Sequence, residues 1–552
     1  MRTGKGRGWL AGTALTIVAL GGSPAMAAAG DPRDARIDAL EQQVKALTDM
    51  VNALRQQRTL PAAAGIPAPP IARAAGSTPV LASAAAPATP PPATSPDQPR
   101  PVTSPGPGPS QGGVTILAGR PSIQSGDGRF VANLHGVMQF DAGGYFQRAA
   151  GPLATDLRRG GAAADAAHAR DLSNGTFFRR ARVGIDGKVF GDFDYNILFE
   201  FGGAGQEDAG HIQELWLQYT GLKPFRFRVG AFPPSIGLED QGSTNGSLFL
   251  ERPAISDIAR GVAGGDFREG AQLAASRDRW FASVALTTRV VGVANSSSNG
   301  SAQPYDQAFG GIVRAAVVPI QGEDYLVLAG AHGSRVFSVS DAGGPDVAAN
   351  RYPFQLRDRP ELRIDGTRLI DTGAINAAHV NSGGLELAAQ KRQFFVQGEY
   401  ERITIERRDS PLANPHFSGW YVEGGLVLTG ERRKFNTGTF AFDAPTVDHP
   451  FDLAAGTFGA FELAGRYSVV DLNYRQGAPG TAPATDAVRG GEQKIIAGGL
   501  NWYLNPVVRF MLEYQHVKID RLSPSATTYS TPVGAQIGQS YDSVAVRSQL
   551  AF

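Results

Sequence analysis

The chain has 552 residues, a formal net charge of +1 and no cysteine. Without cysteine it can form no disulfide, no zinc–thiolate site and no cysteine nucleophile. The balanced charge gives no overall field that would draw nucleic acid or a membrane surface, so any charge selectivity must come from local placement.

Residues 1–29 are predicted to be a secretory signal peptide. A basic start with Lys5 and Arg7 precedes an apolar run over residues 9–19, and two Ala-x-Ala cleavage sites follow within residues 25–29. The apolar run is shorter than the ~20 residues that a membrane-spanning helix needs, and no later stretch reaches that length without a charge. If the exported protein lies in a membrane, we expect it to cross as a closed β-barrel.

Residues 30–58 are predicted to contain a short periplasmic coiled coil. Apolar residues recur there at spacings of three and four over three heptads. They are Ile37, Leu40, Val44, Leu47, Val51 and Leu54. The alternative is an amphipathic helix packed on its own protein, which the proline-rich tract that follows disfavours. By itself the pattern favours a two-stranded coil, whereas a trimeric barrel could impose three strands.

Residues 59–118 are predicted to be an extended linker. Their composition is dominated by Pro, Ala, Ser and Gly, which cannot bury enough apolar surface to fold. In polyproline II form, at ~3.1 Å per residue, the linker could reach on the order of 150 Å.

Residues 119–552 are predicted to form a sixteen-stranded antiparallel transmembrane β-barrel, so the fold class is all-β. Short segments of alternating polarity recur: in residues 176–190, Phe177 and Val183 share one face, while basic residues such as Arg182 occupy the other. A soluble sandwich would alternate in the same way, so alternation alone does not decide. Strands of about ten residues, joined by short turns and long loops in alternation, favour a membrane barrel.

The strand count also predicts which end of the barrel each connection occupies. The strands are expected to begin near residues 130, 176, 192, 210, 224, 268, 280, 308, 324, 381, 393, 417, 456, 493, 506 and 540. An even number places both barrel ends in the periplasm, with short turns there and long loops outside. Residues 233–267 form one of the long external loops. The connection 430–457 breaks the rule, because it is long yet faces the periplasm by this count.

Several motifs of the barrel region are specific enough to compare with known proteins. They are Phe178–Lys188 (FRRARVGIDGK), Tyr219–Phe225 (YTGLKPF), Gly230–Gly237 (GAFPPSIG), Glu251–Pro253 (ERP), Gly424–Glu431 (GGLVLTGE), Phe461–Ser468 (FELAGRYS) and Gly499–Asn505 (GLNWYLN). With them the sequence resembles the phosphate-selective porin O and P family across essentially the whole barrel. The resemblance implies sixteen strands, a homotrimer, an anion-preferring pore and an external loop, 233–267, that folds inward. It also implies that a long periplasmic turn can enter the lumen, which would explain residues 430–457.

Basic residues on the inward strand faces are the predicted pore-lining and substrate-binding residues. They are Arg180, Arg182, Lys188, Arg226, Arg228, Arg314, Arg466 and Arg509, with Arg547 on the same parity. A barrel of this width encloses water, and rings of Arg or Lys in a narrow pore favour anions. Acidic residues also point inward: Asp186, Asp194, Glu200, Glu214, Glu399, Glu423, Glu462 and Glu513. The alternative is therefore that the basic residues only solvate the lumen and pair with acids.

The 233–267 loop adds charges of both signs to the expected constriction. It carries Arg252 and Arg260 against five acids, namely Glu239, Asp240, Glu251, Asp257 and Asp266. The resemblance places a lysine of the phosphate-selective relatives at Asn245. This departure leaves strict phosphate specificity open.

The sequence thus predicts an outer-membrane porin that passes small solutes by diffusion, with anions such as phosphate as the first hypothesis. The alternatives are a general or organic-solute porin with weak selectivity, and an envelope tether acting through the coiled coil. Expected partners are further copies in a homotrimer, outer-membrane lipid, small anions, and a cell-wall or periplasmic component bound through residues 34–58, but no nucleic acid. The eight histidines show no metal-ligand spacing and no catalytic triad can be placed, so no cofactor, metal or enzymatic activity is expected.

Overall fold

The computed structural model describes residues 113–117, 119–147, 172–202, 210–263, 267–291, 306–341, 351–524 and 532–552. The predicted signal peptide and coiled coil, and the linker up to residue 112, lie outside the described residues, so these remain predictions. In the parts of the chain that are described, no helix has both the length and the apolar character needed to cross a membrane.

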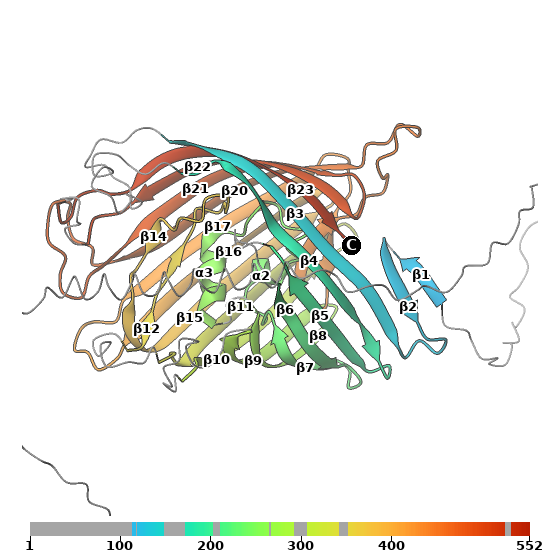
Figure 1. The fold of residues 1–552 in the computed structure, drawn as a ribbon, viewed down its shortest axis with the longest axis horizontal. Helices are drawn as coiled ribbons and strands as arrows, with labels where there is room; N and C mark the ends of the chain where they lie inside the picture. Colours follow the sequence, from blue (N-terminus) through green and yellow to red (C-terminus); the bar gives the residue numbers. More distant parts are fainter. Residues whose placement is uncertain are drawn as a thin grey trace, which may run out of the picture. The chain divides into compact units, whose positions relative to one another are not determined.

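Sixteen antiparallel strands close into one barrel (Figure 1). They are β3 (Val131–Gln147), β4 (Gly175–Val189), β5 (Phe193–Glu200), β6 (His211–Tyr219), β7 (Phe225–Phe232), β8 (Arg268–Arg277), β9 (Trp280–Val290), β10 (Phe309–Gln321), β11 (Tyr325–Ser338), β15 (Ile375–Lys391), β16 (Phe394–Arg407), β17 (His416–Val427), β20 (Ala460–Tyr474), β21 (Val488–Tyr503), β22 (Val508–Asp520) and β23 (Gln539–Ala551). Each strand pairs with the next, and β23 pairs with β3, with Ala545 opposite Gly143. The sixteen-stranded prediction is confirmed.

The largest difference from the predicted bounds is at β15, which begins at Ile375 instead of near residue 381. The first two residues of this extension pair with the short strand β12 (Pro353–Phe354), where Phe354 lies opposite Ile375. Because β12 lies in the preceding loop and is not a wall strand, the pattern of β15 by itself does not indicate this extension.

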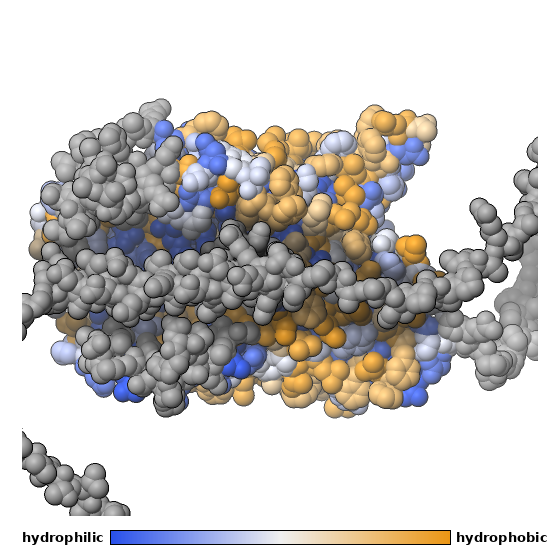
Figure 2. Space-filling model, in the orientation of Figure 1, coloured by the Kyte–Doolittle hydropathy of each residue, from blue (hydrophilic) through white to orange (hydrophobic). Residues whose placement is uncertain are grey.

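The two faces of the barrel wall are inverted relative to a soluble protein. In β15, Leu385 and Leu387 are 64% and 60% exposed, whereas Glu386 between them is 3% exposed. The same order recurs around the wall, and Figure 2 shows apolar side chains gathered on the outer surface. A soluble sandwich would bury the apolar face, so this arrangement indicates a barrel with lipid outside and a polar interior.

A β-bulge in β4 turns two consecutive arginines into the lumen. Gln139 pairs with Arg180, but the next pair joins Phe140 to Phe178, so Arg179 is an extra residue in the ladder. Arg179 and Arg180 are both buried, while Phe178 is 51% exposed on the outer face. The predicted outward position of Phe177 was wrong, because a bulge exchanges the two faces on one side of it.

Three connections fold into the lumen and contribute apolar side chains to the buried core. The β7–β8 connection, here termed the constriction loop, contains α2 (Leu238–Gln241) and α3 (Ala254–Ala263). The β11–β15 connection, termed the bracing loop, contains β12, β13 (Arg357–Asp358) and β14 (Ile370–Asp371). The β17–β20 connection contains the lumen hairpin, β18 (Arg433–Asn436) and β19 (Ala441–Pro445).

These inserted segments pack on one another and on the inner wall. Apolar side chains such as Phe249, Ile255 and Phe440 join one buried cluster with residues of the wall strands. Figure 1 shows α2 and α3 within the ring of strands. The constriction loop and the 430–457 turn therefore both occupy the lumen, as the family resemblance implies.

A hairpin precedes the barrel at the end where the chain terminates (Figure 1). Its strands are β1 (Gly113–Leu117) and β2 (Arg120–Gln124). Ser122 pairs with Asn133 of β3, just beyond the point where Phe552 bonds Gly136. β1 lies within the segment that the sequence assigns to the linker.

Candidate functional site

The open part of the lumen is a cavity of about 520 Å³ between the β3–β7 wall and the constriction loop. It is here termed the eyelet. Its charged lining comprises seven arginines and five acids, namely Arg179, Arg180, Arg182, Arg228, Arg252, Arg260, Arg363, Glu200, Glu214, Asp240, Glu251 and Asp257. The arginines outnumber the acids by two, so the lining has a positive balance.

Two of the eyelet arginines have no carboxylate partner among the described residues. Arg180 donates to the Gln139 side chain at 2.5 Å, and Arg228 donates to Gln218 at 3.0 Å. The Arg228 guanidinium also lies over the Trp216 ring, 4.2 Å from its centroid. Arg182, by contrast, pairs with Glu200 at 2.6 Å. The positive field of the eyelet therefore arises chiefly from Arg180 and Arg228.

The predicted pore-lining residues all lie on inward positions, but they divide into two groups. Arg180, Arg182 and Arg228 line the eyelet. Lys188 lines a neighbouring cavity of about 490 Å³ and pairs with Asp194 at 2.6 Å. This second cavity shares His135 and Asn196 with the eyelet, so the two form adjoining parts of one polar path.

The other predicted arginines hold the inserted segments in place. Arg226 donates to the Gly438 carbonyl at 2.8 Å and Arg314 to the Thr439 carbonyl at 2.7 Å, both in the lumen hairpin. Arg466, Arg509 and Arg547 donate to carbonyls of the constriction loop, at Glu251, Ser247 and Leu250 respectively. Inward acids also hold the constriction loop, as hydrogen-bond acceptors. The Glu399 carboxylate accepts from the Leu238 amide, and the Glu513 carboxylate accepts from the Leu250 amide.

Glu251 is the acid that joins the constriction loop to the arginines of the wall. It pairs with Arg179 at 2.5 Å and with Arg547 at 3.3 Å. Burial favours the neutral carboxyl, but Arg179, Arg363 and Arg547 outweigh it and hold the pKa of Glu251 well below its usual range. Glu251 therefore remains ionised and contributes a negative charge to the eyelet at neutral pH.

Comparison with known proteins agrees with this architecture. Residues 160–552 match the sequence model of the phosphate-selective porin O and P family. The chain belongs to this family. It is 25% identical over 380 residues to Porin O of Pseudomonas aeruginosa, covering 64% of this chain and 79% of the relative. It is 27% identical over 352 residues to an uncharacterized protein of Caulobacter vibrioides, covering 62% and 63% of the two chains.

Solved structures of outer-membrane channels also resemble this porin at low identity. An anion-selective porin from Comamonas acidovorans is 12% identical, with a TM-score of 0.41 and coverage of 76% of this chain and 99% of that one. The outer membrane channel DcaP of Acinetobacter baumannii is 9% identical, with a TM-score of 0.38 and coverage of 77% and 97%. The family and the barrel together place this porin in the bacterial outer membrane, as a channel protein.

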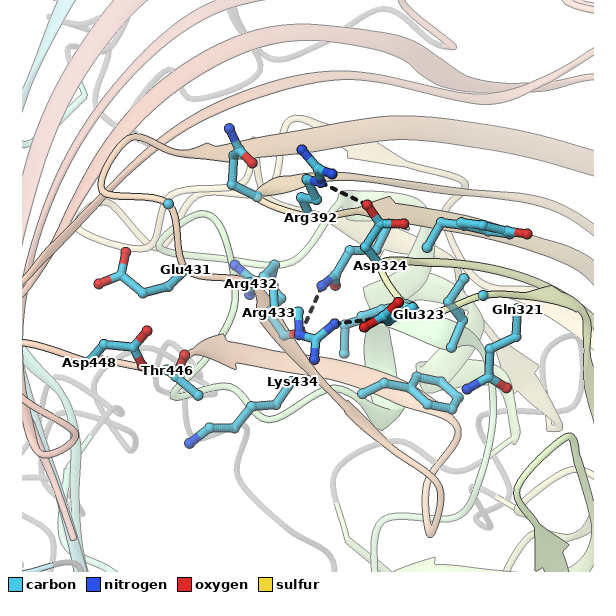
Figure 3. Close-up of a pocket in the computed structure, with 18 residues that line it drawn as sticks. Gln321, Glu323, Asp324, Arg392, Glu431, Arg432, Arg433, Lys434, Thr446 and Asp448 are labelled. Atoms are coloured by element: carbon cyan, nitrogen blue, oxygen red, sulfur yellow. Dashed lines mark hydrogen bonds and ion pairs between the residues drawn. The ribbon is translucent and has the colours of Figure 1, made fainter. Parts of the chain in front are cut away.

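A further cavity of about 870 Å³ lies at the base of the lumen hairpin (Figure 3). Figure 3 shows Arg392 pointing to Asp324, with an Nε to Oδ2 distance of 2.7 Å. Phe435 and Phe442 also line this cavity, and Phe442 packs on Phe395 with 4.8 Å between the ring centroids. Of these three cavities, only the eyelet has a positive balance of charge, and it is therefore the candidate site of this porin.

One buried group of the described residues has the spacing of metal ligands: His332, Glu386 and Glu399. The His332 ring nitrogens already bond Glu386 and Glu401, each at 2.8 Å. Arg314 forms a second contact to Glu386 at 2.8 Å. The contacts therefore describe an ion-paired network that joins neighbouring wall strands.

Sequence reasoning missed two residues of the site. Strict alternation places Arg179 on the outer face, so the sequence does not predict it as a lining residue. The Arg179–Arg180 doublet is the available signal, because two adjacent arginines can both point into the lumen only where the strand has a bulge. Arg363 lies in a connection with no alternating pattern, so no local signal marks it.

Proposed function

We propose that this porin passes small anions through the eyelet by diffusion. The observation that carries the proposal is the pair of lumen-facing arginines, Arg180 and Arg228, that no described carboxylate neutralises. Low-dielectric walls focus the field of such charges in a narrow aqueous path. The guanidinium fork also suits the oxygens of an oxyanion.

Inorganic phosphate is the solute that we propose first, because the family description specifies phosphate-selective porins. A general porin with weak selectivity is the second candidate. It is favoured by the pairing of Arg182 with Glu200 and of Arg179 with Glu251, which leaves only a small excess of positive charge.

Planar-bilayer recordings test the anion preference. In a KCl gradient we expect the reversal potential to show chloride more permeant than potassium. A unit charge about 6 Å from an ion contributes about 0.7 kcal/mol even in a water-like dielectric, or about threefold in partitioning. The charge acts oppositely on chloride and potassium, so Arg180→Gln and Arg228→Gln should each lower the chloride-to-potassium permeability ratio about tenfold.

The matched control is Arg392→Gln, which removes an arginine from a periplasmic turn outside the eyelet. It should leave the ratio unchanged. A wild-type channel without anion preference, or equal effects of all three variants, would contradict the proposal. Competition by added phosphate in the same recordings separates a phosphate-preferring pore from a general one.

We further propose that the porin is a homotrimer whose N-terminal arms, residues 30–112, tether it to the cell wall or to a periplasmic protein. The support is the heptad pattern of residues 37–54 on a long linker. Tethering to one trimer gives the arms a high effective concentration, so a short seam could associate there.

Deletion of residues 31–112 tests the arm separately from the pore. Single-channel conductance and ion preference should stay at wild-type values, whereas chemical cross-linking to periplasmic components should be lost. A deletion variant with altered conductance would show that the arm acts on the channel instead.

A further inference from the structure

We propose that Arg363 of the bracing loop sets the ion preference of the eyelet by neutralising acids of the constriction loop. This inference rests on the proposed anion-conducting function, and it attributes the charge balance of the eyelet to a residue of an external loop. Arg363 is a positioning residue, because it acts on passing ions through the carboxylates with which it forms ion pairs.

Arg363 reaches two acids of the constriction loop at once. Its Nε lies 3.1 Å from Glu251 Oε2, and its Nη2 lies 2.5 Å from Asp257 Oδ2. The side chain is 25% exposed and lines the eyelet beside both acids. The guanidinium therefore lies in the eyelet lining, in contact with both carboxylates.

The charges of the constriction loop show why this contact matters. On the eyelet side the loop carries Arg252 and Arg260 against Asp240, Glu251 and Asp257, which is an excess of one negative charge. Arg363 brings this face of the eyelet to neutrality. Without it, these loop residues would add a net negative charge to the eyelet lining and repel the anions that Arg180 attracts.

Arg363 lies closer to Asp257 than Arg260 does, at 2.5 Å against 3.8 Å. Glu251 keeps Arg179 and Arg547 as close partners when Arg363 is removed. Asp257 is therefore the second site of the test.

Glu361 holds this part of the bracing loop against the constriction loop and the wall. Its carboxylate accepts from the Ala254 amide at the start of α3, at 2.9 Å, and from the Ser468 hydroxyl at 2.6 Å. It also pairs with Arg466 at 3.1 Å. Glu361 has a φ of 50°, which is unfavourable for a residue with a side chain and persists only where surrounding contacts impose it. The position of Arg363, two residues further on, is thereby set relative to α3.

The test compares the permeability ratios of single and double variants with that of the wild type. Arg363→Gln should lower the chloride-to-potassium ratio about tenfold, because the added negative charge lowers chloride partitioning about threefold and raises potassium partitioning by the same factor. The double variant Arg363→Gln/Asp257→Asn should return the ratio to near the wild-type value. Arg363→Lys, which keeps the charge, should resemble the wild type.

Arg359→Gln is the matched control from the same loop. Its Nε donates to the Gly366 carbonyl, and the side chain is not part of the eyelet lining. The ratio should not change in this variant. Gel mobility of unheated samples shows that each variant has folded.

An unchanged ratio in Arg363→Gln would overturn the inference. So would a double variant that keeps the lowered ratio, since Arg363 would then act as a lining charge and not through Asp257. If instead the wild type shows no anion preference but Arg363→Gln still shifts the ratio toward potassium and Asp257→Asn reverses the shift, the proposed function fails while the role of Arg363 stands.

Discussion

Shortening the constriction loop is expected to raise the single-channel conductance several-fold. Replacing residues 238–262 by a short Gly–Ser linker removes α2 and α3, together with buried side chains such as Phe249 and Ile255 that fill the lumen. A sixteen-stranded barrel without such filling encloses a wide aqueous channel. Arg252 and Arg260 are lost as well, so the ion preference should change along with the conductance.

The lumen hairpin provides the comparison for this variant. Replacing residues 434–444 removes Phe440 and Phe442, but it leaves the constriction loop against the β3–β7 wall. Because the eyelet would remain in series as the narrowest part, conductance should rise much less than in the loop variant. A larger rise from the hairpin variant would show that the hairpin, and not the constriction loop, limits the current.

Glu386→Ala is expected to destabilise the folded barrel by about 3–5 kcal/mol, the usual cost of leaving a buried charge without its partner. The Glu386 and Arg314 side chains are both fully buried, 2.8 Å apart. Glu386 also bonds His332 at 2.8 Å, so its loss removes a buried partner from both Arg314 and His332. Urea unfolding of the porin refolded into lipid vesicles measures the change.

The control for this stability prediction is a solvent-exposed ion pair. Asp324→Ala breaks the pair with Arg392, whose side chain is 72% exposed, and should change stability little. Glu386→Gln keeps the shape of the side chain but removes its charge, and it should retain most of the loss. Equal stability of Glu386→Ala and Asp324→Ala would show that the buried network does not stabilise the barrel.

Both predictions concern how segments inside the lumen narrow a wide barrel. Buried arginines such as Arg314 and Arg466 bond the carbonyls of segments that return from distant parts of the chain. Some of the arginines that the sequence predicts to line the pore therefore hold the inserted segments in place instead. The arginines that line the eyelet without a carboxylate partner among the described residues, Arg180 and Arg228, are the smaller part.

The sequence by itself determined the strands and the faces of most side chains. Alternation is a local property, so Phe225 and Phe227 could be placed outside and Arg226 and Arg228 inside without knowledge of the rest of the chain. The strand count and the exceptional 430–457 connection followed from the same pattern, because turn length and sidedness are linked in outer-membrane barrels. The bulge at Arg179 is a departure from this local order that changes the site.

Only the tertiary structure decided which inward charges face the path. Arg180 and Arg466 occupy the same kind of strand position, yet Arg180 lines the eyelet while Arg466 is enclosed by groups that include the carbonyl of Glu251, 215 positions away. Arg363 reaches its two acids from a loop that has no periodic pattern. Exposure and ion pairing in this lumen depend on segments that meet only after the barrel closes around them, and no local pattern of residues contains that information.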